Sequence, residues 1–191
     1  MKWLKLVDRC LLFVDGNNQL LLNLLKEAEV ELTRKVNILE NEISITAGDA
    51  IQFYALPDDY KSCIAVLVEG SMLKPMTDDE IFYDNDNELY TGTPSGYLIR
   101  GNNIFFSSKP NSGDMIKVVY NSLAEVDIGS QYPIIPEIFQ KDLCNYAIAL
   151  AVAKELPTMY DKFWNAWLVN IEEIKNEMAD RELLYNMKEE I

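Results

Sequence analysis

The stretch from residue 94 to residue 120 limits the possible folds most, because it has the pattern of three short strands joined by tight turns. The expected strands are Tyr97 to Ile99, Ile104 to Phe106 and Met115 to Tyr120. Gly101-Asn102-Asn103 tolerates positive φ, and Pro110 to Asp114 is a typical loop sequence. The pattern predicts a three-stranded β-meander, and no catalytic motif accompanies it.

Helical periodicity occurs on both sides of this stretch. Apolar residues recur at helical spacing over residues 2–14, 18–39, 136–155 and 158–180. Asp15 to Asn18 separates the first two segments and can cap the second. Each of these helices has an apolar face to bury, so we expect them to pack together into one bundle.

The hydrophobic period changes after residue 40. Alternation at Ile43 and Ile45 and the run from Ile51 to Tyr54 predict strands. Residues 63–68 fit either a buried strand or a helix by period alone. The sequence therefore predicts an α+β fold, with a helical bundle from both termini and a central β-rich insertion.

The predicted organisation is a single domain, in keeping with a length of 191 residues. It consists of N-terminal helices over residues 1–40, a β-rich insertion over 41–132, and C-terminal helices with a docking tail over 133–191.

Composition excludes several classes of function. The chain has 17 basic and 31 acidic residues, a net charge of −14, and no histidine. Tight nonspecific binding to nucleic acid needs a basic patch, and no run of basic residues is longer than Arg34-Lys35. Without histidine, the usual triads and zinc sites are missing. We expect no enzymatic activity, no cofactor and no metal.

The three cysteines are odd in number and far apart in the sequence. They are typical of reduced thiols in a chain that matures in a cytoplasm. No apolar segment is long enough for a membrane span, and we expect no membrane association.

The segment Asp84-Asn85-Asp86-Asn87-Glu88 resembles the opening of a calcium-binding loop. Leu89 stands at the sixth position, where such loops have glycine, and Ser95 stands at the twelfth, where they have glutamate. A solvated acidic loop is the better interpretation.

An apolar stripe closes the chain, at helical spacing among charged residues. It comprises Leu183, Leu184, Met187 and Ile191. Chain ends usually fray unless they are held in place. The stripe therefore indicates docking onto a partner, although packing on the chain's own bundle is an equally simple interpretation.

Three segments together carry a resemblance to a known family. They are residues 94–106 (PSGYLIRGNNIFF), 117–120 (KVVY) and 135–139 (IPEIF), the last followed by Tyr146-Ala147. This order resembles the head-to-tail connector proteins of tailed bacteriophages, in particular the adaptor and tail-tube gatekeeper proteins of short-tailed phages. The resemblance spans most of the chain.

The resemblance implies a structural ring, usually of twelve copies, beneath the portal of the virion. Such a ring extends the channel for double-stranded DNA, which passes without sequence-specific binding, and offers a platform for tail or further neck proteins. The family has no catalytic residues, and its members assemble in the cytoplasm of the bacterial host. The acidic segment, residues 78–88, has no matching feature in the family. We expect some of its carboxylates to face the lumen or a basic neighbour: Asp78, Asp79, Glu80, Asp84, Asp86 and Glu88.

Two other functions remain open at this point. One is a tail-tube or tail-completion protein built on the same module. The other is a β-rich module that binds a small ligand or carbohydrate, with helices on either side. Ring assembly predicts oligomers, whereas a ligand module predicts a monomer with a concave pocket.

Overall fold

The structure is a computed structural model that describes residues 1–49, 51–82, 90–125 and 130–189, with side chains up to residue 179. It contains both helices and sheets, which confirms the α+β class. The helical elements are α1 (Trp3–Cys10), α2 (Asn18–Lys35), α3 (Asp78–Phe82), η1 (Glu137–Phe139), α4 (Leu143–Val152) and α5 (Pro157–Glu189). The strands are β1 (Glu40–Thr46), β2 (Phe53–Ala55), β3 (Tyr60–Val68), β4 (Ser71–Met72), β5 (Lys74–Pro75), β6 (Gly96–Arg100), β7 (Asn103–Phe106) and β8 (Met115–Ser122).

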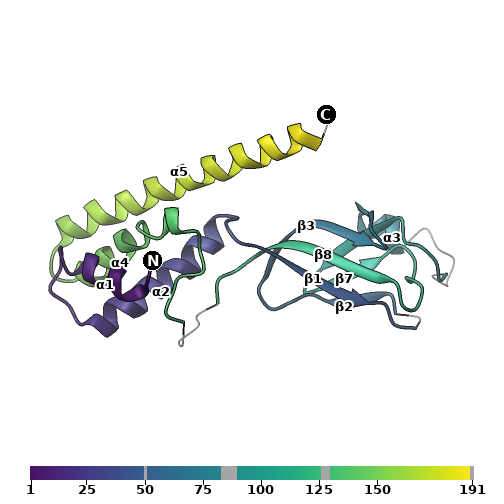
Figure 1. The fold of residues 1–191 in the computed structure, drawn as a ribbon, viewed down its shortest axis with the longest axis horizontal. Helices are drawn as coiled ribbons and strands as arrows, with labels where there is room; N and C mark the ends of the chain where they lie inside the picture. The colour runs from purple at the N-terminus through teal and green to yellow at the C-terminus, as the bar shows by residue number, and fades with distance from the viewer. Residues whose placement is uncertain (50, 83–89, 126–129, 190–191) are drawn as a thin grey trace. The chain divides into compact units, whose positions relative to one another are not determined.

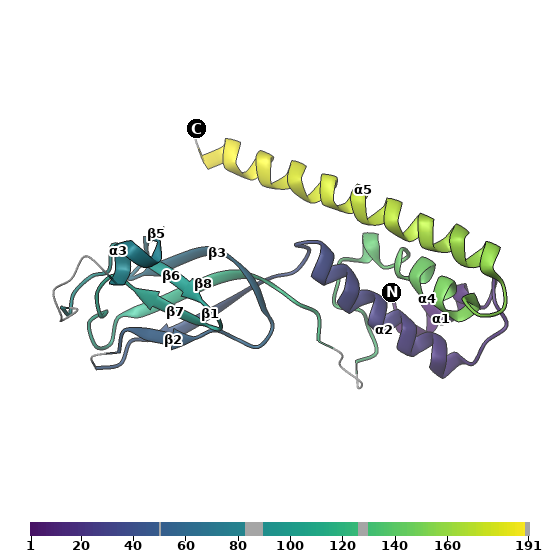
Figure 2. The same ribbon diagram turned by 180° about the vertical axis from the view of Figure 1, so that it is seen from behind.

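The chain divides into two compact units, each with its own hydrophobic core (Figures 1 and 2). Residues 1–39 and 123–191 form the helical unit, and residues 40–122 form the β unit. The helical unit is therefore assembled from both ends of the chain.

In the helical unit, α4 is the central element and contacts α1, α2 and α5. Its residues are apolar on almost every side, as expected for a helix that other helices surround. The cap expected between the first two helices is present, since the Asn17 side chain accepts a hydrogen bond from the Gln19 backbone N–H at 2.7 Å. From α5, a stripe of Phe163, Trp167, Ile171 and Ile174 enters the core.

Two four-stranded sheets form the β unit. One has the order β1-β8-β3-β4, and the other has the order β2-β7-β6-β5. Alternate residues of the strands fill the core, for example Ile116 and Val118 of β8 and Ile104 and Phe106 of β7. Residues 63–68, left open between strand and helix, lie in β3.

The expected β-meander is wrong in its third strand. β6 and β7 form the expected hairpin, with Gly101 at φ 60° in the turn, but β8 does not continue their sheet. Instead β8 pairs with β1 and β3 in the other sheet. The reason is the long loop after Phe106, which gives the chain enough length to reach the other sheet. Within this loop, Pro110 has no N–H to donate to a strand ladder. Crossing still lets β8 bury an alternating apolar face.

Helix ends also differ from the expected positions. α2 ends at Lys35, because Val36 has extended backbone angles, and so it stops before the expected end at residue 39. Pro136 opens the short 3-10 helix η1, and α4 begins only at Leu143. Pro157, which stops the preceding helix, is the first residue of α5, where its missing N–H costs no hydrogen bond.

Candidate assembly surfaces

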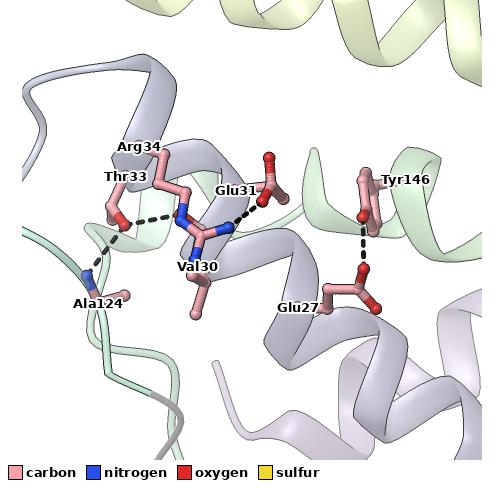
Figure 3. A network of polar contacts seen from close by, with 7 residues as sticks. All are labelled: Glu27, Val30, Glu31, Thr33, Arg34, Ala124 and Tyr146. Carbon is pink, nitrogen blue, oxygen red and sulfur yellow. Dashed lines mark hydrogen bonds and ion pairs between the residues drawn. The ribbon is translucent and has the colours of Figure 1, made fainter.

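Several side chains of α2 make polar contacts with other parts of the helical unit (Figure 3). Thr33 is buried, its hydroxyl donates to the Val30 carbonyl at 2.9 Å, and its oxygen accepts from the Ala124 N–H at 2.9 Å. The next residue, Arg34, forms an ion pair with Glu31 at 2.6 Å. The Thr33 contacts tie the segment after β8 to α2.

Glu29 is a buried carboxylate that holds a second segment. Its Oε1 accepts the backbone N–H groups of Ile134 and Ile135 at 2.7 and 3.1 Å. Burial raises the pKa of this carboxyl, while the two N–H groups and nearby Lys26 act in the opposite direction. Glu29 thus fixes the chain just ahead of η1.

Tyr146 joins α4 to α2 through a single hydrogen bond. Its hydroxyl donates to Glu27 Oε1 at 2.8 Å, as Figure 3 shows, and burial raises the pKa of the phenol, as does the neighbouring carboxylate. The Tyr146 ring lies 5.9 Å from the ring of Trp164 and 5.4 Å from that of Trp167. The aromatic residues of α5 therefore pack within the unit, as their helical spacing indicates.

A groove of about 560 Å³ runs along α2. The α2 residues that line it are spaced at one helical turn: Gln19, Leu22, Asn23, Lys26, Glu27, Val30, Glu31 and Arg34. Two cations, Lys26 and Arg34, and two carboxylates, Glu27 and Glu31, line it, without a nucleophile beside a base. Among the described residues, no three acidic or cysteine side chains are grouped closely enough to hold a metal ion. The chemistry of the groove suits binding of a polypeptide better than catalysis.

Large apolar side chains are exposed at many points of the helical unit. Leu12, for example, is 78% exposed and Ile138 is 61% exposed. The helical unit exposes Leu4, Leu12, Phe13, Leu20, Tyr132, Ile134, Ile138, Leu156, Leu168 and Val169. Single exposed apolar residues are ordinary, and a surface that closes against a partner is built from such side chains where they are contiguous.

The structure places only part of the acidic segment. Asp78, Asp79 and Glu80 form the exposed first turn of α3, whereas Asp84, Asp86 and Glu88 lie outside the described residues. Glu80 accepts hydrogen bonds from the N–H and hydroxyl of Thr77, and these bonds lower the pKa of its carboxyl. The suggested calcium loop also lies outside the described residues.

The C-terminal stripe is placed by its backbone alone. α5 runs through Leu183, Leu184 and Met187 to Glu189, which extends the helix beyond the expected end near residue 180. The side chains of these three residues and the whole of Ile191 lie outside the described part. Docking by the stripe stays a prediction.

Sequence reasoning missed Glu29 and Thr33. Neither is apolar and neither was expected in the core, yet both are buried. A signal was available for Glu29, which stands four residues after Leu25 and three before Leu32, both of them fully buried. A polar residue so placed on a helix must find partners inside the protein.

A family model of the SU10 adaptor protein matches residues 1–182, almost the whole chain. The chain belongs to the SU10 adaptor protein family. This is a family of phage adaptor proteins, which confirms the resemblance seen in the sequence. No curated protein matches the chain.

Membership of the SU10 adaptor protein family gives the chain a structural role in the phage particle, of the neck or connector kind. An adaptor interacts with other proteins of the capsid or tail, and adaptors of this kind are not typically enzymes. Within the described residues, no helix combines the length and the apolar character that crossing a membrane requires.

Proposed function

We propose that this adaptor forms a head-to-tail connector ring of twelve copies beneath the portal, extends the DNA channel and provides a platform for the tail. The observation that carries the proposal is the family match over residues 1–182. The exposed apolar residues of the helical unit support it, because a ring subunit must bury surface against two neighbours. In this proposal the helices from both termini act as one bundle, and the β unit is an insertion into that bundle.

Light scattering coupled to size-exclusion chromatography tests the proposal. The full chain should form closed oligomers, either alone or when the portal protein is added, and the mass of the complex gives the copy number. A chain that stays monomeric with the portal present and binds a small ligand or carbohydrate would contradict it. Assembly with tail proteins but not with the portal would instead indicate a tail-tube or tail-completion protein.

The C-terminal stripe is proposed to dock on the portal or on an adjacent subunit. Its four apolar side chains can each contribute roughly 1.5–3 kcal/mol when buried, before the cost of ordering is subtracted. An amphipathic helix laid into a groove uses such a surface. We expect a chain truncated after residue 180 to keep its fold but to assemble more weakly.

The control for this truncation is a full-length chain with Leu183→Ser, Leu184→Ser and Met187→Ser, which keeps the helix length and removes the apolar surface. Circular dichroism should show both variants folded, and light scattering should show both defective in ring or portal assembly. Unchanged assembly, or a truncated monomer that fails to fold, would place the stripe in the subunit's own core.

A further inference from the structure

The exposed side of α1 is rich in cations, although the chain as a whole has a net charge of −14. Lys2, Lys5 and Arg9 are exposed at or within this helix, against a single exposed carboxylate, Asp8. Their spacing of three and four residues places them close together on the exposed surface of the helix. Two exposed leucines, Leu4 and Leu12, lie in the same region. We call Lys2, Lys5 and Arg9 the α1 cation face.

Two of these cations are available to a partner. Lys2 Nζ lies 5.8 Å from the centre of the Tyr132 ring, and neither Lys2 nor Lys5 makes an ion pair with any described residue. The third, Arg9, has a role inside the subunit: burial raises the pKa of the Asp142 carboxyl, and the charge of Arg9 acts in the opposite direction. A test of the α1 cation face should therefore change Lys2 and Lys5 and leave Arg9 in place.

The β unit has a segment with the opposite charge bias, rich in carboxylates. Residues 75–99 contain six carboxylates and neither lysine nor arginine. Within this segment, Asp78, Asp79 and Glu80 are consecutive and exposed on α3. Glu80 is bonded to Thr77, whereas Asp78 and Asp79 form no ion pair with the described residues. We call Asp78 and Asp79 the α3 acid pair.

We propose that the α1 cation face of one copy binds the α3 acid pair of the next copy in the ring. This inference rests on the proposed ring. Copies with a charge of −14 repel one another, and a contact that places the cations of one against carboxylates of the other offsets this repulsion. The two regions differ, so the contact is head-to-tail, which is the kind that closes into a ring. The leucines beside the cations supply apolar area, and the charges set partner and register.

A charge-swap experiment with the full chain and the portal protein tests the contact. Lys2→Glu/Lys5→Glu and Asp78→Lys/Asp79→Lys should each raise the concentration needed for assembly by roughly tenfold or more, because like charges then meet. Mixing the two variants should restore assembly, since each supplies the charge that the other has reversed. Added salt should weaken wild-type assembly, because exposed charges are screened over about 8 Å at physiological ionic strength.

Matched controls change net charge by the same amount at other exposed positions. Lys35→Glu/Lys154→Glu and Glu155→Lys/Asp161→Lys should assemble as wild type does. Assembly of the milder Lys2→Gln/Lys5→Gln variant should be weakened less than assembly of Lys2→Glu/Lys5→Glu. Circular dichroism of every variant verifies that the fold is kept.

Five results would overturn the inference. An equal loss of assembly in the control variants would indicate a general effect of net charge. Restoration in one chain carrying both swaps, but not in the mixture, would place the contact within a copy. Normal assembly of Lys2→Glu/Lys5→Glu, combined with loss of binding to a double-stranded DNA fragment, would assign the α1 cation face to nucleic acid. If the wild-type chain forms no oligomer with the portal, the proposed ring is wrong. If wild-type rings form and every charge swap is tolerated, the ring stands and only this contact is wrong.

Discussion

Replacing Trp167 with alanine should lower the free energy of unfolding by about 3–5 kcal/mol, the usual cost of removing a large aromatic side chain from a core. Trp167 is 0% exposed and lies between α4 and the rest of the α5 stripe. Its ring meets the edge of the Tyr146 ring at 5.4 Å and an interplanar angle of 65°. The substitution removes this contact and leaves a cavity at the centre of the helical unit.

Urea unfolding followed by circular dichroism measures the effect. Leu168→Ala is the matched control, because Leu168 is the next residue of α5 but is 42% exposed, and we expect its cost to be below about 1 kcal/mol. Equal costs for the two variants would mean that α5 does not pack on α4 through the Trp167 side.

Local pattern was enough to predict the main helices, because α1, α2 and α5 each bury an apolar stripe at a period of 3.6 residues and α4 is apolar on almost every side. Asn17 illustrates this well, since a cap and the apolar stripe after it lie within a few residues of each other. The sheet to which β8 belongs could not be predicted in the same way. Its partners in β1 and β3 lie more than 45 residues earlier, and an alternating strand fits either sheet equally well.

The candidate surfaces were only partly predictable for a similar reason. The acidic segment is visible because its carboxylates are close in sequence, and Asp78, Asp79 and Glu80 are indeed exposed. The α1 cation face is not visible as a basic run, because Lys2, Lys5 and Arg9 are separated by other residues and come together only on a helix. Nor does the sequence state which backbone groups a buried carboxylate such as Glu29 will bind.

The second large effect should come from Glu29→Ala, which we expect to cost about 2–4 kcal/mol. Glu29 is only 4% exposed, and its loss leaves the backbone N–H groups of Ile134 and Ile135 without their acceptor. A buried donor without a partner costs about 1–3 kcal/mol. The segment before η1 should also loosen, so hydrogen exchange at these two amides should accelerate in the variant.

Glu29→Gln separates the hydrogen bonds from the charge. The glutamine oxygen can still accept both N–H groups, so this variant should lose much less stability than Glu29→Ala. The Glu29→Gln substitution also removes an ionisable group. Because burial raises the pKa of the Glu29 carboxyl above its usual 4.5, the folded chain holds the proton more tightly than the unfolded chain does. The stability that the folded chain gains from this tighter proton binding at Glu29 is therefore fully present below about pH 4.5 and is lost as pH rises through the raised pKa.

The stability of wild type relative to Glu29→Gln should accordingly fall as pH increases over this window. Urea unfolding of both chains at a series of pH values measures the difference directly, and titrations shared by the two chains cancel. A difference that grows in favour of wild type with rising pH would mean that the two N–H groups and Lys26 outweigh burial. In that event Glu29 holds the 134–135 segment as a stabilised carboxylate, and the pKa of its side chain is lowered in the folded protein.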